Sequence, residues 1–477
     1  MKYLLLQIPS GYEFHPTIDA PQKILSYHPP LGLLYLGHVL ENEGHAVEII
    51  DFCAEKYPLQ TVQKNLASTD VVGISVFSSA YQESMKGGRY THAYKESAKV
   101  AGFIKARDPT IPILIGGPHC TIIQEQALQE IPAADICLQG DGEEAIKEIA
   151  QAVEGKKSFS DIAGVFYREK NHIHKGKPAK IIEDLDTIPF PARHLVDKYE
   201  YGKTSISSFF KQKFTSMITG RGCPFTCRFC TRNAFGFRMF RKRSVKNVVE
   251  ELQEISGHYD SVMIVDDTFF ADQKRAEQIL DELIDIGTDL ELYIQGAKVN
   301  TAQKDTYAKM KKAGVRHLYF GLESGNQDVL DFYHKKTTIG QIIKAISLSS
   351  EMGFFTEGTF ILGAPIETKQ HIENTIRFAC SLPLDIAKFT ILTYKYGSPL
   401  WDEAVKAGNI TASDEYTVVA DSRRGLGNLT REQLEFSYRK AMVSFYLRPR
   451  IITKQLIQRL SMKKEVDAPP HRSSNLL

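Results

Sequence analysis

The sequence predicts an α/β protein: a doubly wound, Rossmann-like parallel sheet domain, then a partial (β/α)6 barrel of the TIM type, then a small helical C-terminal region. Apolar strand-like segments alternate with helical patterns over residues 1–155 and again over 213–400, and a proline-containing stretch separates the two series. The chain has 477 residues, more than one compact domain usually holds. We therefore expect a first domain over 1–155, a hairpin and linker over 156–205, a barrel over 206–400 and a helical region over 401–477.

The first series is typical of strands joined by helices in a parallel sheet. The continuous apolar run VVGISVFS (71–78) indicates a strand that is buried on both faces. A helix is expected from Leu31 to Glu43, because Gly44 follows as a stop signal. The other expected elements are strands at 2–8, 46–51 and 111–117, a helix at 90–107, and a short strand with a helix within 134–155.

The second series holds six strand candidates separated by helical patterns such as VKNVVEELQEIS. Six such units predict a barrel or partial barrel, whose chemistry takes place at the carboxyl ends of the strands. The candidates are FTSMITG, SVMIVDD, LELYIQG, HLYFGLES, FFTEGTFILG and IAKFTILT.

Composition narrows the function classes. The net charge of +2 gives no reason to expect a nucleic-acid or membrane partner, and no apolar run is long enough to span a bilayer. The opening MKYLLLQIPS is too short for a signal peptide, so we expect a cytoplasmic protein with reduced thiols. Four scattered cysteines are expected to be small buried side chains: Cys53, Cys120, Cys137 and Cys380.

The other three cysteines crowd into TGRGCPFTCRFCTRN (219–233), just after the first strand of the second series. Cys223, Cys227 and Cys230 have the spacing C-x3-C-x2-C. A structural zinc site usually has four ligands, and the next histidine downstream is His258. An iron–sulfur cluster normally takes four thiolates, so three would leave one iron open to a small molecule. The spacing favours such an open cluster, with zinc and chance as alternatives.

This run resembles the cluster loop of the radical S-adenosylmethionine (SAM) superfamily, C-x3-C-x-Φ-C, in which Phe229 fills the aromatic position Φ. The resemblance implies that the three cysteines hold a [4Fe–4S] cluster and that the amine and carboxylate of SAM bind the fourth iron. One electron then splits SAM and gives a 5′-deoxyadenosyl radical. The cofactors supply the difficult chemistry, while the protein orients them and excludes water.

Further stretches resemble SAM-binding segments of the same superfamily. YFGLESG (319–325) implies that Glu323 and Ser324 contact the ribose or amine of SAM, unless Glu323 is a solvated carboxylate. FILGAPIET (360–368) resembles the segment whose backbone meets adenine, and Gly363 would allow that close approach. In IVDDTFF, Asp266 and Asp267 stand where the family often places a polar group for the amino end of SAM, unless they are turn residues. Weaker candidates are Gln295 and Lys298.

The first series resembles the cobalamin-binding domain of B12-dependent radical SAM enzymes, in PPLGLLYLGHVLENEGHAVEIIDF, IGGPHCT and GDGEEA. The motif D-x-H-x-x-G, which supplies a histidine to cobalt in many B12 proteins, is absent. The expectation of cobalamin therefore depends on loops that follow parallel strands, where open α/β sheets bind ligands. The candidate residues are Ser75, Ser78, Gly116, Gly117, His119, Thr121 and Gly140, and the alternative is a domain that has lost its cofactor.

The resemblance, which extends over nearly the whole chain, implies a cobalamin-dependent radical SAM enzyme. The expected reaction is methyl transfer from cobalamin to an unactivated carbon of a small-molecule or lipid-like substrate. The alternative is an oxidation or ring closure like that of the anaerobic magnesium-protoporphyrin ester cyclases. The expected electron donor is flavodoxin or ferredoxin, and the basic run RMFRKRSVK (238–246) is either a solvated face or a docking surface for that acidic partner.

Overall fold

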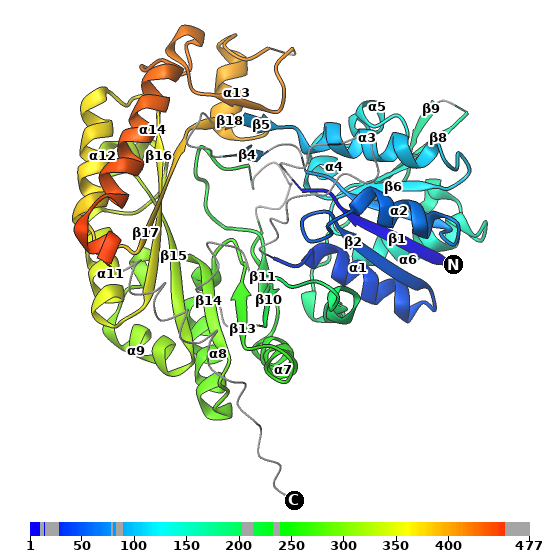
Figure 1. Cartoon of the computed structure of the whole chain (residues 1–477), viewed down its shortest axis with the longest axis horizontal. Coiled ribbons are helices and arrows are strands. Elements are labelled where there is room, and N and C mark those ends of the chain that lie inside the picture. Colours follow the sequence, from blue (N-terminus) through cyan, green and yellow to red (C-terminus); the bar gives the residue numbers. More distant parts are fainter. Residues whose placement is uncertain are drawn as a thin grey trace, which may run out of the picture.

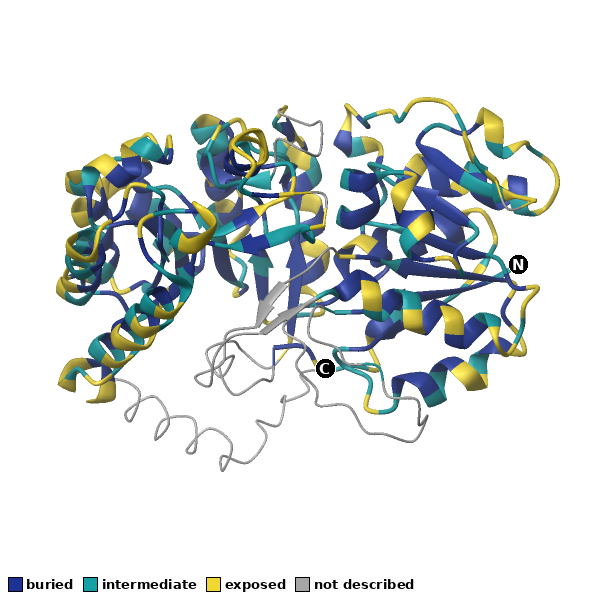
Figure 2. Ribbon diagram, turned by 90° about the horizontal axis from the view of Figure 1, so that it is seen from above, coloured by how far each residue is buried: buried dark blue, intermediate teal, exposed yellow. Residues whose placement is uncertain are grey.

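The computed structural model describes residues 1–9, 14, 28–77, 80–82, 89–170, 172–202, 213–231, 239–411 and 413–453, with only the backbone for the strands at 80–82 and 89–91. Two α/β domains lie side by side, the first coloured blue to cyan and the second green to yellow (Figure 1). In both domains, the buried strands are covered by helices whose outer faces are exposed (Figure 2). The predicted fold class is confirmed.

The first domain contains a seven-stranded sheet in the order β2-β1-β3-β6-β7-β8-β9. Its first five strands are parallel, and a hairpin that follows the last helix of the domain adds two antiparallel strands at the edge. The strands are β1 (Lys2–Gln7), β2 (Ala46–Asp51), β3 (Val71–Ser75), β6 (Ile113–Gly116), β7 (Ile136–Leu138), β8 (Val165–Glu169) and β9 (His172–Lys175).

Helices cover both faces of this sheet because successive side chains of a buried strand point to opposite faces. Tyr3 and Leu5 of β1 pack in the cluster that includes α1 (Leu31–Asn42) and α6 (Glu143–Val153). Leu4 and Leu6 pack with the helices on the other face: α2 (Pro58–Leu66), α3 (Ala93–Lys105) and the short α4 (Pro118–Ile123) and α5 (Gln126–Glu130). Helix α3 begins later than expected, because residues 89–91 form strand β5 (Arg89–Thr91), which pairs with β4 (Ala80–Gln82).

The second domain contains six parallel strands in chain order, and the sheet stays open between its first and last strands. The strands are β10 (Phe214–Met217), β13 (Ser261–Ile264), β14 (Glu291–Ala297), β15 (Val315–Glu323), β16 (Phe355–Leu362) and β17 (Ile386–Ile391). The helices between them are α7 (Val245–Ser256), α8 (Gln273–Ile286), α9 (Lys304–Lys312), α10 (Gln327–Phe332), α11 (Ile339–Glu351) and α12 (Lys369–Ser381).

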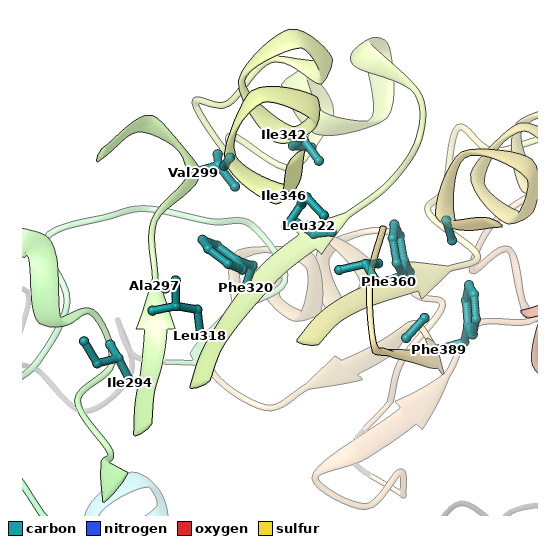
Figure 3. Packing of buried hydrophobic residues seen from close by; sticks show 14 of the residues in the cluster. Ile294, Ala297, Val299, Leu318, Phe320, Leu322, Ile342, Ile346, Phe360 and Phe389 are labelled. Carbon is teal, nitrogen blue, oxygen red and sulfur yellow. The ribbon is translucent and has the colours of Figure 1, made fainter. Parts of the chain in front are cut away.

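Alternate side chains of the barrel strands face these helices and form the core. Leu318, Phe320 and Leu322 of β15 pack with Ile342 and Ile346 of α11 (Figure 3). The opposite side chains of the same strands line the inner face of the partial barrel. The inner face and the strand ends are therefore where ligands can meet the domain.

The C-terminal region covers the end of the barrel. It consists of α13 (Pro399–Lys406), an unexpected antiparallel pair of β18 (Thr393–Lys395) with β19 (Thr417–Val419), and α14 (Arg431–Tyr446). The buried face of α14 joins the core of the barrel beside α12 and β17 (Figure 1). None of the helices in the described ranges is long and apolar enough to cross a membrane.

Candidate active site

The three clustered cysteines lie in the loop that follows β10 and the short β11 (Gly220–Arg221), at the carboxyl end of the first barrel strand. All three are free and half-buried. Burial raises the pKa of the Cys223 thiol above its ordinary value and that of Cys227 to about 11. Since only thiolates bind metal, loading this loop must release protons.

The donor set fits a cluster rather than a single ion. Within the described parts of the chain, no three His, Cys, Asp or Glu side chains converge where one metal ion could be held. A [4Fe–4S] cluster instead binds each thiolate at a different iron, so its thiols need not meet at one point. Three thiols along one loop therefore fit a cluster that leaves one iron open, whereas a structural zinc site usually takes four ligands.

Arg228, between the second and third cysteines, fastens this loop to the barrel. Its backbone N–H donates to the Tyr333 carbonyl (3.1 Å), and its carbonyl accepts from the Leu400 N–H (3.1 Å). Its guanidinium pairs with Glu403 of α13 at 2.5 Å. The ring of Phe229 packs edge-on against buried Tyr333, with centroids 5.0 Å apart. Contact between Phe229 and SAM stays a prediction.

A buried ion pair borders the cysteine loop. Lys335 Nζ lies 2.6 Å from Glu323 Oε1, and the Glu323 carboxylate is almost fully buried. Burial would lower the pKa of Lys335, but Glu323 and the thiols of Cys227 and Cys230 raise it, so the lysine stays charged. Glu323 itself has a φ of 62°, which is uncommon for a residue with a side chain and is typical of functional sites. Lys335 is not among the residues predicted from the sequence, although the basic HKKTT stretch follows the Glu323 strand closely.

Lys298 approaches the same loop from β14. Its ammonium lies 3.8 Å from the centroid of the Phe225 ring, within the loop. Burial lowers its pKa, whereas the neighbouring Cys223 and Cys227 raise it. The structure thus places Lys298, one of the weaker candidates, beside the cysteine thiols.

Three other predicted SAM residues make protein contacts. Ser324 is fully buried, and its hydroxyl lies 3.2 Å from the Thr375 hydroxyl of α12. At Gly363, with a φ of 102°, an added Cβ would lie 2.9 Å from the Leu434 side chain of α14. Both oxygens of Asp266 accept hydrogen bonds from Thr219, and burial raises the pKa of this carboxyl to about 6. The structure thus gives these residues bracing roles, and direct contact with SAM stays a prediction.

A cavity of about 370 Å³ lies where the two domains meet. Carboxyl ends of strands from both sheets border it, through Ser75 and Gly116 of the first domain and Ile218 and Val265 of the barrel. Its inner part is an apolar slot between the first sheet and helices α1 and α6, lined by Leu5, Leu33, Gly73, Leu114 and Ile146. Asp267, rather than Asp266, reaches the wall on the barrel side.

Most of the described residues predicted to bind cobalamin gather around this cavity: Ser75, Gly116, Gly117, Thr121 and Gly140. The Thr121 hydroxyl donates to the Gly117 carbonyl (3.0 Å) and accepts from the Gly140 N–H (3.1 Å), which ties two of the loops together. His119 is not among the lining residues: it is fully buried, stacks on Tyr94 and lies 3.0 Å from Glu130. Ser78 lies outside the described residues.

The cavity fits part of a cobalamin. The slot is apolar, and at Gly117 an added Cβ would lie 3.1 Å from the Val76 carbonyl, so this backbone approaches its surroundings closely. Such a narrow slot with polar loops at its mouth suits a flat aromatic base on a ribose phosphate, which is the nucleotide tail of cobalamin.

An ion network joins the loops that border the two cofactor sites. Arg221, two residues before Cys223, pairs with Asp141 (2.9 Å) and Glu143 (2.5 Å), which follow Gly140. Arg241 of β12 (Arg241–Lys242) also pairs with Asp141 and donates to the Ile182 carbonyl. Burial alone would raise the pKa of Asp141, but the two arginines hold it below its ordinary value.

This network changes the interpretation of the basic run at 238–246. Arg241 and Arg243 turn inward, the latter to buried Glu251, and only Lys242 and Lys246 of the described cations in the run are exposed. Arg241 and Arg243 thus belong to the interior, and docking of an acidic partner on the exposed lysines stays a prediction. The charges of the run can be seen in the sequence, but their partners cannot. Asp141 is 100 residues from Arg241, and Glu251 is eight residues from Arg243, in α7.

Comparisons with known proteins agree with both parts of this arrangement. Residues 217–379 match the family model of the Radical SAM superfamily, and residues 22–150 match the B12 binding domain. The chain is 32% identical over 451 residues to the uncharacterized methyltransferase PH0819 of Pyrococcus horikoshii, covering 93% of each protein. It is 26% identical over 408 residues to the anaerobic magnesium-protoporphyrin IX monomethyl ester cyclase of Cereibacter sphaeroides, covering 82% of this chain and 62% of that protein.

The same fold occurs in the structure of the radical SAM methyltransferase TsrM from Kitasatospora setae with cobalamin and a [4Fe–4S] cluster bound. The TM-score is 0.69 with 16% sequence identity, over 94% of this chain and 89% of that one. The predicted cofactors are confirmed: a [4Fe–4S] cluster, SAM and cobalamin. The chain belongs to the B12-binding radical SAM enzyme family, whose members include relatives of both methyltransferases and magnesium-protoporphyrin ester cyclases.

Proposed function

We propose that this enzyme transfers a methyl group to an unactivated carbon of a small-molecule or lipid-like substrate. One observation carries the proposal: a single cavity is bordered by the Gly140–Glu143 loop of the cobalamin domain and by Gly220–Gly222, which lead into the cluster loop. A reaction that used only the cluster would not need a cavity lined by residues of both domains. The 32% identity to PH0819, a named methyltransferase, over nearly the whole length of both proteins supports it further.

When bound, the cluster with SAM supplies a radical that removes hydrogen, and cobalamin supplies a methyl group. The residues of the chain orient these groups. Glu323 and Lys335 present a fixed carboxylate and a fixed ammonium beside Cys227, suited to the amine and carboxylate of SAM. The Arg221–Asp141 pair fixes the distance between the two loops, on which transfer between the two sites depends. We further propose flavodoxin or ferredoxin as the electron donor.

An oxidation or ring closure without methylation is the second candidate, favoured by the identity to the cyclase of Cereibacter sphaeroides. The two reactions differ in how they consume SAM. Methyl transfer converts one SAM to S-adenosylhomocysteine and a second to 5′-deoxyadenosine. The second candidate forms no S-adenosylhomocysteine.

The test is anaerobic purification from cells supplied with hydroxocobalamin, followed by iron and cobalt analysis and by incubation with SAM and a reductant. We expect about four irons and one cobalt per chain, and formation of both SAM products. Cys227→Ala should lose iron and 5′-deoxyadenosine while the chain stays folded, and Cys380→Ala, which removes a half-buried thiol on α12, should keep both. Cobalt without any S-adenosylhomocysteine would refute methyl transfer and leave the oxidative candidate.

A further inference from the structure

A two-stranded ribbon of the C-terminal region reaches from the barrel to the first domain. Strands β18 and β19 form this ribbon, and the buried side chains of Tyr394, Val418 and Ala420 anchor its base in the barrel core. The Tyr396 N–H donates to the Tyr416 carbonyl at 2.9 Å, which extends the pairing of the two strands by one step. Tyr416 therefore stands at the tip of a ribbon whose base is fixed in the barrel.

The tip of the ribbon packs on helices of the first domain, near α13 and β18 (Figure 1). The Tyr416 ring lies edge-on to the rings of Tyr94 in α3 and His119 in α4, at centroid distances of 5.7 Å and 5.2 Å. Its hydroxyl donates to the Glu130 carboxylate of α5, 286 residues earlier in the chain, and accepts from Gln126 Nε2 at 3.0 Å. These contacts form a second junction between the domains, apart from the ion network described above.

The neighbouring residue, Glu415, adds little to this junction. Glu415 pairs with Lys95 and lies 2.5 Å from His92, but the side chains of Lys95 and Glu415 are 47% and 36% exposed. Exposed ion pairs contribute little to stability. Tyr416, in contrast, packs half-buried against the core of the first domain. The junction therefore depends mainly on Tyr416.

Through this junction, Tyr416 holds helix α4. Glu130 accepts the Tyr416 hydroxyl with one carboxylate oxygen, and its other oxygen lies 3.0 Å from His119 Nε2. His119 is fully buried and stacks on Tyr94 at a centroid distance of 4.8 Å, with Tyr416 against its edge. A residue of the C-terminal region thus fixes a helix that borders the cavity between the domains. The start of this helix lines the cavity through Gly117, Pro118 and Thr121.

The same part of the C-terminal region also holds the cluster loop. Helix α13 lies between the two ribbon strands in the sequence, and its Trp401 ring packs on Tyr396 of the ribbon at a centroid distance of 5.6 Å. Leu400, beside Trp401, donates its N–H to the Arg228 carbonyl, and Glu403 pairs with the Arg228 guanidinium. Helix α13 and the ribbon therefore contact both the helix at the cavity and the loop of the three cysteines.

We propose that Tyr416 is a positioning residue for cobalamin, because it holds the start of α4 in the shape that binds the cofactor. A preformed wall saves the free energy of ordering that wall on binding, so loss of this clamp lowers the affinity. Since α13 and the ribbon also hold Arg228, we expect cobalamin binding to order the cluster loop as well. Tyr416 has this role whichever of the two candidate reactions the enzyme catalyses, provided that the cavity binds cobalamin.

The test is equilibrium dialysis against hydroxocobalamin, with enzyme purified anaerobically from cells that receive no cobalamin. Tyr416→Ala should raise the Kd at least about tenfold, because it removes the ring contacts and the hydrogen bond together. Tyr416→Phe removes only the bond to Glu130 and should raise the Kd about threefold. The matched control is Tyr446→Ala, which removes a tyrosine of α14 whose hydroxyl donates to the Ala387 carbonyl of the barrel at 3.0 Å. This control should leave the Kd unchanged.

Hydrogen–deuterium exchange then separates positioning from general stability. Each variant is first checked for an unchanged circular dichroism spectrum and iron content. Saturating hydroxocobalamin should slow exchange at residues 117–124 and 222–231 of the unchanged protein, and Tyr416→Ala should lose the slowing at 222–231.

Equal Kd values for Tyr416→Ala and Tyr446→Ala would overturn the proposal, whether both are raised or both unchanged. Failure of the unchanged protein to bind hydroxocobalamin would overturn it as well. Slowing at 222–231 that persists in Tyr416→Ala would overturn the link to the cluster loop. None of these measurements needs turnover, so they do not depend on whether the enzyme transfers a methyl group.

Discussion

The ion network between the domains gives a prediction whose magnitude follows from burial. Asp141→Asn removes the carboxylate that Arg221 and Arg241 share, and the side chains of Asp141 and Arg241 are only 9% and 5% exposed. Breaking a buried pair by removing one partner costs about 3–5 kcal/mol. Because Asn keeps one oxygen that can accept from an arginine, we expect about 2–4 kcal/mol of the free energy of unfolding to be lost.

For a domain of 150–250 residues, this loss corresponds to a fall in Tm of about 5–15 °C. Differential scanning calorimetry is the assay, because weaker docking should also split unfolding into two transitions, one for each domain. The matched control is Asp161→Asn, whose pair with Lys177 has both side chains more than half exposed and should cost less than about 1 kcal/mol. If Asp141→Asn behaves like Asp161→Asn, the network does not hold the domains together and the reasoning is refuted.

Two further predictions concern the cavity predicted to bind cobalamin and the end of β16. Gly117→Val adds a branched side chain where φ is 101° and where a Cβ would lie 3.1 Å from a carbonyl oxygen. The purified variant should therefore hold much less cobalt and an unchanged amount of iron. The control Gly102→Ala, at a position with open space, should change neither metal content. Burial raises the pKa of Glu367 from 4.5 to about 7, so the folded chain keeps that proton longer than the unfolded chain and loses stability as the pH rises from about 4.5 to 7. Urea titrations across this pH range should show that the free energy of unfolding of Glu367→Gln falls by about 3 kcal/mol less than that of the unchanged protein. Parallel plots of this free energy against pH for the two proteins would contradict the prediction.

Local sequence signals predicted what lies within one element or one loop. The three cysteines, the strands that precede each ligand loop and the glycines at Gly116, Gly117 and Gly140 could all be placed because strand, turn and loop signals are short-range. The side on which a residue acts was predicted less well. Phe320 and Leu322 face the helices, and Ser324 lies toward Thr375 on α12. Strand alternation could not predict the direction of Glu323 or Ser324, because Glu323 has a φ of 62° and ends the strand.

Long-range packing could not be predicted from such signals. Gly363 gives room to Leu434, which comes 71 residues later in α14, and no local pattern indicates that neighbour. The same holds for the pairing of Arg221 with Asp141 between two domains. A hint was present, since both residues stand between glycines, in GRG and GDG. Opposite charges in two glycine-flanked loops can be noticed in a sequence, but only the fold shows that they meet.

The charges around the cysteine loop explain why the site favours an anionic cluster. Lys335 is neutralised by Glu323, whereas Lys298 pairs with no carboxylate within the described ranges and rests on the Phe225 ring. An uncompensated, half-buried cation is costly in the empty chain, as the lowered pKa of Lys298 indicates. Three thiolates on a cluster bring negative charge to the side of Lys298 and remove that cost. Cluster binding therefore stabilises the charged form of Lys298, and the charged lysine stabilises the bound cluster. No such coupling is expected if Lys298 only packs against the Phe225 ring.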